Sequence, residues 1–464
     1  MALLARGLTW RRTLLVACEH ALIVSAVLVA ARLRLGPDVW VSFVDEYLLA
    51  RAVLIAVVLQ ICLHYSDLYD LRQTADRRDL LTRLVQSVGA ASMTLAFLYY
   101  WIPDLVIGRG VFLIAAGLII GLVAGWRLVF DWLSLRVGPA ERLLIVGTTG
   151  AAVDLARELF ERRQELGVEL VGFVDQDPSK VGTAVLNPGV VGHVADIPRI
   201  VRERHVDRVV VSLGDARGKL SMDQLLEMKL KDGVSFDHLA SVYERYTGKI
   251  AVENLRPSWF IFSPEFRRNR FYLRVKRAMD LLGGLTGLLL ASPLMLLTAL
   301  GVRLTSAGPV FYHQRRVGQD GTVFTVHKFR SMRVDAEAGT GAVWAVENDP
   351  RVTAFGRFMR KTRLDELPQL WNVVKGDMSL VGPRPERPEF VEDLTQTIPF
   401  YGQRHVVKPG LTGWAQIRYA YGSTVEDALE KLQYDLYYIK NLSAVFDVYI
   451  MLETAKTVIL RKGT

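Results

Sequence analysis

The chain has 464 residues, a hydrophobic fraction of 51% and a formal net charge of +9 at pH 7. Its mean hydropathy of +0.22 is higher than a soluble protein needs, so the composition predicts a membrane protein with substantial soluble parts. The positive charge is typical of contact with anionic lipid headgroups or phosphorylated substrates, whereas no zinc-finger spacing or RNA-binding signature occurs, and we expect no nucleic-acid partner.

Four apolar stretches open the chain, and each has about the 20 residues needed to cross a bilayer. They cover residues 13–31, 47–65, 84–102 and 111–130. Arginines concentrate before the first stretch, between the second and third, and after the fourth, so the positive-inside rule places both ends of the bundle in the cytosol. The only cysteines, Cys18 and Cys62, lie inside these stretches and exclude a disulfide framework. Glu19 and His20 leave a transporter role open, although no other stretch shows an obvious polar partner.

From Glu141 the chain changes to short β-branched runs that alternate with amphipathic helices. Strands are predicted at residues 142–147, 169–175 and 208–213, with a helix at 151–163. This alternation predicts a doubly wound parallel sheet, that is, a Rossmann-like α/β domain. Thr149 replaces the second glycine of the GxGxxG pattern, which argues against a bound pyrophosphate, whereas Asp175 follows the second strand at a suitable distance for ribose. Nucleotide binding and a structural or regulatory role both stay open.

The next apolar segment, residues 281–302, carries no charge. A straight helix of this length would span about 33 Å, so a fifth transmembrane helix is one interpretation. A re-entrant helix over about residues 278–304 is favoured instead, because cations flank both ends whereas a crossing helix should have asymmetric flanks. In addition, Pro293, which follows Ser292 near the middle, removes a backbone hydrogen bond at a typical cost of about 3 kcal/mol. A bend at Ser292–Pro293 would return the chain to the cytosolic side.

Two segments beyond this helix are expected to be soluble but close to the membrane. Lys328 and Arg330 end a strand predicted at residues 322–329 and would share one face if the strand continued. Both would then meet phosphate oxygens, and a solvated charged edge is the alternative interpretation. Trp414, in a Gly/Pro-rich loop at residues 406–416, is expected at a membrane interface.

An adjacent carboxylate pair, Asp365–Glu366, closely follows Arg360, Lys361 and Arg363. A neighbouring cation lowers the pKa of an aspartate and keeps it ionised, so Asp365 is a candidate metal ligand or nucleophile toward phosphorus. Arg360 precedes Asp365 by five residues and reaches the same site only if the helix ends or turns between them. Adjacent acids more often form a solvated face, so the pair alone is a weak indication of catalysis.

Five ordered blocks in the C-terminal part together resemble one known family. They are Lys328–Met332, Thr362–Asn372, Lys375–Pro385, Lys408–Gln416 and Asp435–Asn441. The blocks closely resemble the bacterial sugar transferases, which are monotopic phosphoglycosyl transferases, and the resemblance covers about residues 268–464. With four apolar stretches and a Rossmann-like domain before it, the chain is similar to the large, exopolysaccharide-initiating branch of that family.

The resemblance implies an activity and a role for particular residues. The family moves a sugar-1-phosphate from a UDP-sugar to undecaprenyl phosphate, releases UMP and uses Mg²⁺. By this resemblance Asp365 is the nucleophile that forms a covalent phosphosugar intermediate and lies at the metal, and Glu366 assists as a general base or metal-site partner. Arg360 and Arg384 match phosphate-binding arginines, and Ser292–Pro293 matches the break in the family's re-entrant helix. No cofactor is implied for the Rossmann-like domain.

The sequence thus predicts three parts: a four-span helical bundle at residues 1–135, a cytosolic Rossmann-like domain at 136–262, and a mixed, mainly α catalytic domain at 263–464. We expect a bacterial inner-membrane enzyme with its catalytic domain on the cytosolic face, in contact with membrane lipid. A homodimer is a further expectation. Glucose or galactose is the usual sugar of the branch, but no residue identifies it. The rival hypothesis is a nucleotide-sensing membrane scaffold with a degenerate catalytic domain.

Overall fold

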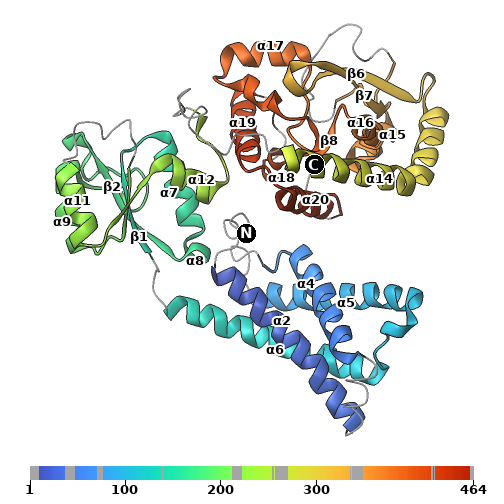
Figure 1. Ribbon diagram of the computed structural model, residues 1–464, viewed down its shortest axis with the longest axis horizontal. Coiled ribbons are helices and arrows are strands. Elements are labelled where there is room, and N and C mark those ends of the chain that lie inside the picture. The colour runs from blue at the N-terminus through green and yellow to red at the C-terminus, as the bar shows by residue number, and fades with distance from the viewer. Residues whose placement is uncertain are drawn as a thin grey trace. The chain divides into compact units, whose positions relative to one another are not determined.

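The structure is a computed structural model, shown in Figure 1, and it divides the chain into two compact units, Met1–Val242 and Tyr243–Thr464. The described residues are 10–36, 47–69, 77–136, 141–211, 222–252, 255, 270–334, 336, 349–419, 422 and 424–459. The basic segment that precedes residue 270 lies outside them.

The first unit begins with long apolar helices. They are α2 (Trp10–Leu35), α4 (Leu48–Tyr65), α5 (Arg77–Trp101) and α6 (Arg109–Arg136), with a short η2 (Pro103–Leu105). The described residues contain five helices long and apolar enough to cross a membrane, of which these are four. Large apolar side chains such as Met93 and Leu113 are 78% and 71% exposed on the protein surface. Apolar residues on the outside as well as in the core are typical of helices surrounded by lipid. The number of actual crossings stays a prediction.

The helical bundle contains buried polar contacts that the sequence did not reveal. Glu19 and Arg127 form an ion pair of 2.7 Å between α2 and α6, and their side chains are 0% and 4% exposed. The ring of His20 lies 2.8 Å from the side chain of Gln60 on α4. The expectation that other stretches offer no polar partner was therefore wrong, because each partner is a single polar residue inside an apolar run. Both contacts connect helices of the bundle to one another.

The remainder of the first unit contains a parallel sheet of five strands in the order β3-β2-β1-β4-β5. The strands are β1 (Glu141–Val146), β2 (Val168–Asp175), β3 (Val190–His193), β4 (Arg208–Val211) and β5 (Ser235–His238). The connecting helices are α7 (Gly150–Glu161), α8 (Arg163–Leu166), η3 (Pro178–Lys180), η4 (Val194–Asp196), α9 (Ile197–Glu203) and α11 (Met222–Lys231). Figure 1 shows α9 and α11 on one side of the sheet and α7 on the other. This arrangement confirms the doubly wound parallel sheet.

The Asp175 carboxylate, a candidate for ribose binding, accepts hydrogen bonds from residues of its own domain. One oxygen of Asp175 accepts hydrogen bonds from Thr148 at 2.6 Å and from Lys180 at 3.2 Å, and the other accepts from the Asp177 amide at 3.0 Å. Burial raises the pKa of Asp175, but these donors outweigh it and the pKa is lowered below the ordinary value. Asp175 is thus satisfied without a nucleotide.

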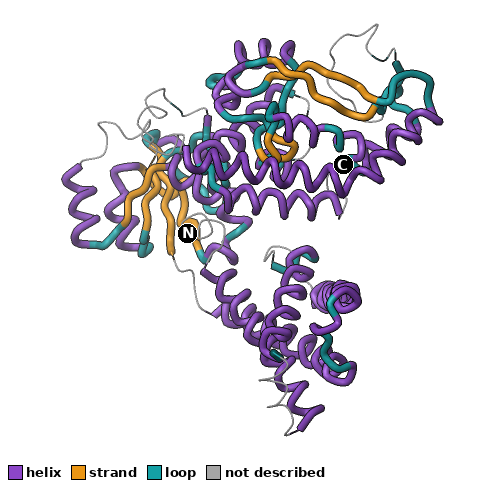
Figure 2. Tube along the Cα trace, turned by 45° about the vertical axis from the view of Figure 1, so that its right-hand side comes forward, coloured by secondary structure: helices purple, strands orange, loops and turns teal. Residues whose placement is uncertain are grey.

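The second unit is mainly helical, as predicted. Its first elements are α12 (Leu239–Thr247), which begins in the first unit, α14 (Arg270–Thr305), β6 (Phe311–Val317), η7 (Gln319–Gly321), β7 (Val323–Phe329), α15 (Ala354–Lys361), η8 (Leu364–Glu366) and α16 (Gln369–Lys375). They are followed by β8 (Ser379–Val381), α17 (Pro388–Thr397), η9 (Tyr401–Val406), β9 (Gly410–Thr412), α18 (Trp414–Arg418), α19 (Val425–Lys440) and α20 (Ala444–Ile459). Figure 2 shows the antiparallel hairpin of β6 and β7 as the longest pair of strands in this unit.

Trp414 lies in the core of this unit, so its expected place at a membrane interface was wrong. It is 5% exposed, stacks on Tyr437 with ring centroids 6.0 Å apart, and donates a hydrogen bond to the Gly248 carbonyl at 2.9 Å. Ile250 and Val252 pack in the same core. The segment after Tyr243, which the sequence assigned to the end of the middle domain, therefore contributes to the core of the second unit.

Helix α14 continues through Pro293 instead of being interrupted there. Pro293 has no amide hydrogen to donate to the Leu289 carbonyl one turn earlier. The Ser292 hydroxyl donates to that carbonyl at 2.7 Å and so replaces the missing bond. In Figure 1 the part of α14 that precedes β6 runs in a different direction from its N-terminal part. The Ser292–Pro293 step is therefore compatible with a helix that bends without losing its hydrogen-bonded backbone.

Candidate active site

The carboxylate pair lies on a tight turn between two helices. Helix α15 ends at Lys361, and Arg363 adopts the left-handed region with φ of 58° before the single turn η8 that carries Asp365 and Glu366. Pro368 then precedes α16, and its ring favours the start of a helix. Asp365 and Glu366 are only 7% and 9% exposed, so the pair is not the solvated face of a helix.

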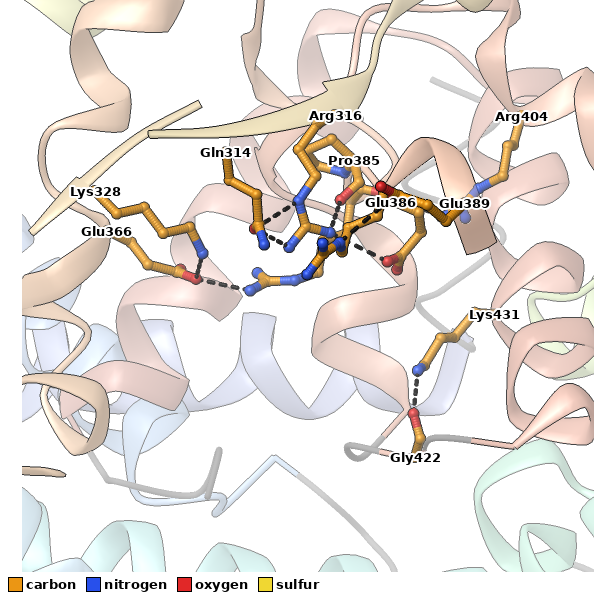
Figure 3. A network of polar contacts seen from close by, with 12 residues as sticks. Gln314, Arg316, Lys328, Glu366, Pro385, Glu386, Glu389, Arg404, Gly422 and Lys431 are labelled. Atoms are coloured by element: carbon orange, nitrogen blue, oxygen red, sulfur yellow. Dashed lines mark hydrogen bonds and ion pairs between the residues drawn. The ribbon is translucent and has the colours of Figure 1, made fainter. Parts of the chain in front are cut away.

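Glu366 is held by cations from separate elements. Its Oε1 accepts a hydrogen bond from Arg384 Nη2 at 2.7 Å, and Lys328 Nζ lies 3.3 Å from the same oxygen, as Figure 3 shows for Lys328. Arg363 is 4.0 Å away. Burial alone would raise the pKa of Glu366, but the charges of Arg384 and Lys328 outweigh it and hold the pKa well below its usual range. Glu366 is therefore ionised and is held through its Oε1.

Asp365 has a different environment from its neighbour. Across the part of the chain that the structure describes, it accepts no hydrogen bond. Burial raises its pKa above the ordinary value, and the charge of Glu366 raises it further, while Lys328 and Arg360 act in the opposite direction. The predicted lowering of the Asp365 pKa was wrong, because burial dominates and the nearest cations bind Glu366. The pair thus consists of one paired carboxylate and one unpaired carboxylate.

Of the two cations at the end of the hairpin, the structure brings only Lys328 to the carboxylates. The pKa of Lys328 is lowered below its ordinary value, because burial outweighs the opposite effect of the Glu366 charge. Arg330 instead donates to the carbonyls of Ser306 and Ala307 at 2.9 and 2.8 Å, directly after the end of α14. Strand β7 ends at Phe329, so the alternation that would have put Arg330 on the face of Lys328 stops one residue too early.

Arg360 reaches the region of the pair from the last turn of α15. Its Nε donates to the Ser331 hydroxyl at 3.0 Å, and its charge acts on the Asp365 carboxyl. The turn at Arg363 supplies the change of direction that the five-residue spacing required.

Arg384 belongs to a segment that two backbone strands hold closely. Strands β8 and β9 pair in parallel, and Gly382 follows β8. A Cβ atom at Gly382 would lie 2.4 Å from the Lys408 carbonyl oxygen, so this position needs glycine. The close approach fixes where the chain leaves β8, two residues before Arg384.

Sequence reasoning missed two arginines that contact the same segment, the partly buried Arg316 and the buried Arg404. Arg316, on β6, donates to the Pro385 carbonyl at 3.1 Å and to the Gln314 side chain. Arg404, in η9, donates to the Arg384 carbonyl at 3.1 Å. The alternation of Gln314 and Arg316 along a predicted strand could have indicated a shared polar face. Nothing in the local pattern around Arg404 distinguished it.

Mg²⁺ fits this chemistry in one particular way. The described residues contain no group of three or more His, Cys, Asp or Glu side chains that could hold a metal. Mg²⁺ is commonly bound through one or two carboxylates together with substrate phosphates, and not in a cage made only of protein ligands. Asp365, with carboxylate oxygens that no described donor occupies, meets that requirement.

The chain is similar to known proteins in both of its units. The family model described as bacterial sugar transferase matches residues 271–461, and a model described as CoA-binding domain matches residues 64–234. A UDP-N-acetylgalactosamine-undecaprenyl-phosphate N-acetylgalactosaminephosphotransferase from Aeromonas hydrophila is 42% identical over 226 residues, which are 49% of this chain and 52% of that protein.

Two further relatives match over longer ranges, and both bear the name UDP-glucose:undecaprenyl-phosphate glucose-1-phosphate transferase. The protein from Escherichia coli K12 is 37% identical over 337 residues, 71% of this chain and 70% of its own length. The protein from Xanthomonas campestris pv. campestris is 32% identical over 463 residues, 96% of this chain and 93% of its own length. With a family model over its second unit and a relative matched almost from end to end, the chain belongs to the bacterial sugar transferase family.

Proposed function

We propose that the protein transfers a hexose-1-phosphate from a UDP-sugar to undecaprenyl phosphate, releases UMP, and so begins the synthesis of an exopolysaccharide. The names of the relatives supply the reaction class, and one of them is an exopolysaccharide production protein from Rhizobium leguminosarum. The observation that carries the proposal is the unequal pairing of two adjacent buried carboxylates: Glu366 is bound by Arg384 and Lys328, and Asp365 is not.

The unpaired carboxylate is suited to nucleophilic attack. In the first step an Asp365 oxygen attacks the phosphorus that bears the sugar, a bond from that oxygen to phosphorus forms, and the bond from phosphorus to the bridging oxygen breaks. The electron pair leaves with UMP. In the second step a phosphate oxygen of undecaprenyl phosphate attacks the same phosphorus, and the bond to Asp365 breaks, which restores the carboxylate.

The residues around Asp365 orient the anions and do not themselves react. Lys328 and Arg384 are held by ionised Glu366, so both cations meet a bound diphosphate without the cost of ordering a free side chain. Arg360, held by Ser331, adds positive charge from the other side of the turn. Asp365 would hold Mg²⁺, which when bound neutralises charge on the donor's phosphates.

The membrane topology of α14 belongs to the same proposal: we infer that it re-enters and does not cross. At its N-terminal part Lys276 donates to the Val381 carbonyl at 3.0 Å, and Asp280 accepts from the Leu380 amide at 2.9 Å. Near its C-terminal end Val302 packs in a cluster with Phe329 and Met359. Both ends thus contact one folded unit. A straight crossing of about 30 Å of hydrocarbon would separate them.

Cysteine labelling tests this topology. A cysteine is introduced at the exposed Arg315, after α14. A membrane-impermeant reagent should label it in inverted vesicles, where the cytosolic face is outside, and should not label it in right-side-out vesicles. Labelling from the external side would mean that α14 crosses the bilayer.

Release of UMP tests the function. Purified protein is incubated with Mg²⁺, undecaprenyl phosphate and each of a set of UDP-sugars, and UMP is measured. Release of UMP that depends on the donor, and that continues beyond one equivalent of enzyme only with the polyprenyl acceptor, supports the transferase. If the protein binds UDP-sugars but yields no UMP with any donor, the nucleotide-sensing scaffold is the better assignment.

A further inference from the structure

Arg404 is a buried arginine of the second unit that contacts the backbone of an active-site candidate, Arg384. It lies in η9, is 5% exposed, and its guanidinium forms an ion pair of 2.8 Å with Asp435 of α19. The same guanidinium donates to the Tyr401 hydroxyl at 2.5 Å and to the Arg384 carbonyl at 3.1 Å. Three different segments therefore meet at one buried cation, and one of them carries an arginine of the candidate active site.

The Arg384 carbonyl is in an unusual stretch of backbone. Pro383 and Pro385 flank it, and neither has an amide hydrogen to donate. Backbone amides hold the carbonyls on either side, from Gly410 to Pro383 and from Val317 to Glu386, each at 2.9 Å. Side chains supply the donors for the two carbonyls in between: Arg404 to the Arg384 carbonyl and Arg316 to the Pro385 carbonyl. In Figure 3 Arg316, Pro385 and Glu386 lie together, with dashed lines to the Arg316 side chain.

At its other end Arg384 reaches the carboxylate pair. Its Nη2 lies 2.7 Å from Glu366, so a continuous series of contacts runs from Asp435 through Arg404 and the Arg384 backbone to Glu366. A buried ion pair contributes little net stability compared with apolar residues of the same volume, because the cost of desolvating both charges offsets their attraction. Apolar residues in place of Arg404 and Asp435 would lose the fixed hydrogen-bonding geometry of the pair.

We propose that Arg404 and Asp435 are positioning residues: they fix the backbone of Arg384 so that its guanidinium meets Glu366 and the phosphates of the donor. Neither touches the reacting atoms. The proposal rests on the transferase function. It adds that part of the donor's binding geometry is set by a buried ion pair beyond Arg384, in η9 and α19.

The test compares Arg404→Lys in two backgrounds. Lysine keeps the charge but loses the planar group that bonds Asp435, Tyr401 and Arg384 together. In the otherwise unmodified enzyme we expect a fall of about 10- to 100-fold in kcat/KM for the UDP-sugar, since small displacements of orienting groups have effects of that size. The KM for undecaprenyl phosphate should change by less than about 3-fold, because the acceptor need not contact Arg384 to bind its lipid tail.

In an Arg384→Ala background the same Arg404→Lys substitution should have almost no further effect, because the side chain that it positions is gone. A loss of equal size in both backgrounds would overturn the proposal and leave Arg404 as a purely structural residue. Wild-type kinetics for Arg404→Lys would also overturn it.

Tyr401→Phe is a milder second variant, for the case that Arg404→Lys fails to fold. It removes one acceptor of Arg404 and keeps the packed ring, and it should give a smaller fall in kcat/KM that likewise vanishes in the Arg384→Ala background. If the unmodified protein releases no UMP from any UDP-sugar, the proposed function fails first. The positioning proposal is contradicted only when the unmodified enzyme is active and the cycles are additive.

Discussion

Two glutamate–arginine pairs with buried glutamates, one in each unit, have the same shortest N–O distance of 2.7 Å: Glu19–Arg127 in the helical bundle and Glu366–Arg384 in the second unit. The arginines differ in exposure. The Arg127 side chain is 4% exposed, whereas that of Arg384 is 34% exposed. Arg127 spends a further donor on the Leu68 carbonyl at 2.5 Å.

The comparison shows how a structural ion pair in the bundle differs from the pair at the proposed active site. The bundle pair is enclosed on both sides and connects helices. The second pair leaves its arginine open to solvent and stands beside an unpaired acid, Asp365. Partial exposure of one charge, next to a carboxylate without a donor, is what a ligand can use.

The largest effect is expected for Asp365→Asn. Amide nitrogen and oxygen are too weakly nucleophilic to attack phosphorus, so UMP release should fall by about 10⁴-fold or more, as for other essential nucleophiles. Thermal unfolding in detergent measures whether the fold is retained. Asp393→Asn, an exposed position on α17, is the matched control and should keep full activity. Activity of Asp365→Asn near that of the control would remove Asp365 as the nucleophile.

Glu19→Gln should affect stability instead of chemistry. It leaves Arg127 buried with an uncompensated charge, which typically costs about 3–5 kcal/mol. We expect a lower midpoint of thermal unfolding, while the protein that remains folded keeps its kcat. A variant with unchanged stability and impaired turnover would mean that the bundle pair takes part in the reaction and that the two pairs are not different in kind.

Arg384→Lys should show the reverse behaviour. Lysine keeps the charge but cannot bridge Glu366 and a phosphate with a planar group, so kcat/KM should fall about 10²-fold, the usual size for loss of one charge-stabilising donor. The unfolding midpoint should change little, because Arg384 is partly exposed. Arg387, three residues on, forms an ion pair with Glu389 at 3.5 Å, and Arg387→Lys provides the comparison. Equal effects of the two substitutions would argue against a special role for Arg384.

The smallest effect is a displacement of the pH profile in Lys328→Gln. Asp365 must be ionised to react, so activity falls as the pH drops through its pKa, which burial and Glu366 raise above the ordinary value. The charge of Lys328 lowers that pKa, and its removal should therefore move the acid limb of the kcat/KM profile to higher pH. An acid limb that stays in place would mean that another group controls it.

The sequence predicted the helical stretches, the parallel sheet and the segment that carries Asp365, because periodicity and short blocks are local properties. It failed where the outcome depends on what lies across the fold. Trp414 became a core residue because Gly248, far away in sequence, accepts its hydrogen bond. Arg404 and Asp435, which are separated by more than 30 positions, showed no sign of pairing.

The errors at the site have the same origin. Arg330 left the face of Lys328 because β7 ends at Phe329, and strand ends are set by pairing with β6 and not by composition. The pKa of Asp365 was misjudged because the count of nearby cations ignores both burial and the competing claim of Glu366 on those cations. The sequence gives the number of charges, whereas the energy of their interaction depends on the distances between them and on solvent exposure.

Two contacts connect α14 to the segment that carries Arg384. Lys276 and Asp280, one helical turn apart on α14, hold consecutive residues of β8, and Arg384 follows only three residues after Val381. A change in the tilt or depth of α14 would therefore displace the segment that carries Arg384. Because the hydrocarbon thickness of a bilayer influences helix tilt, the proposed re-entry of α14 predicts that the surrounding lipids affect turnover. The same protein should then have a different turnover in detergent and in membranes of native thickness.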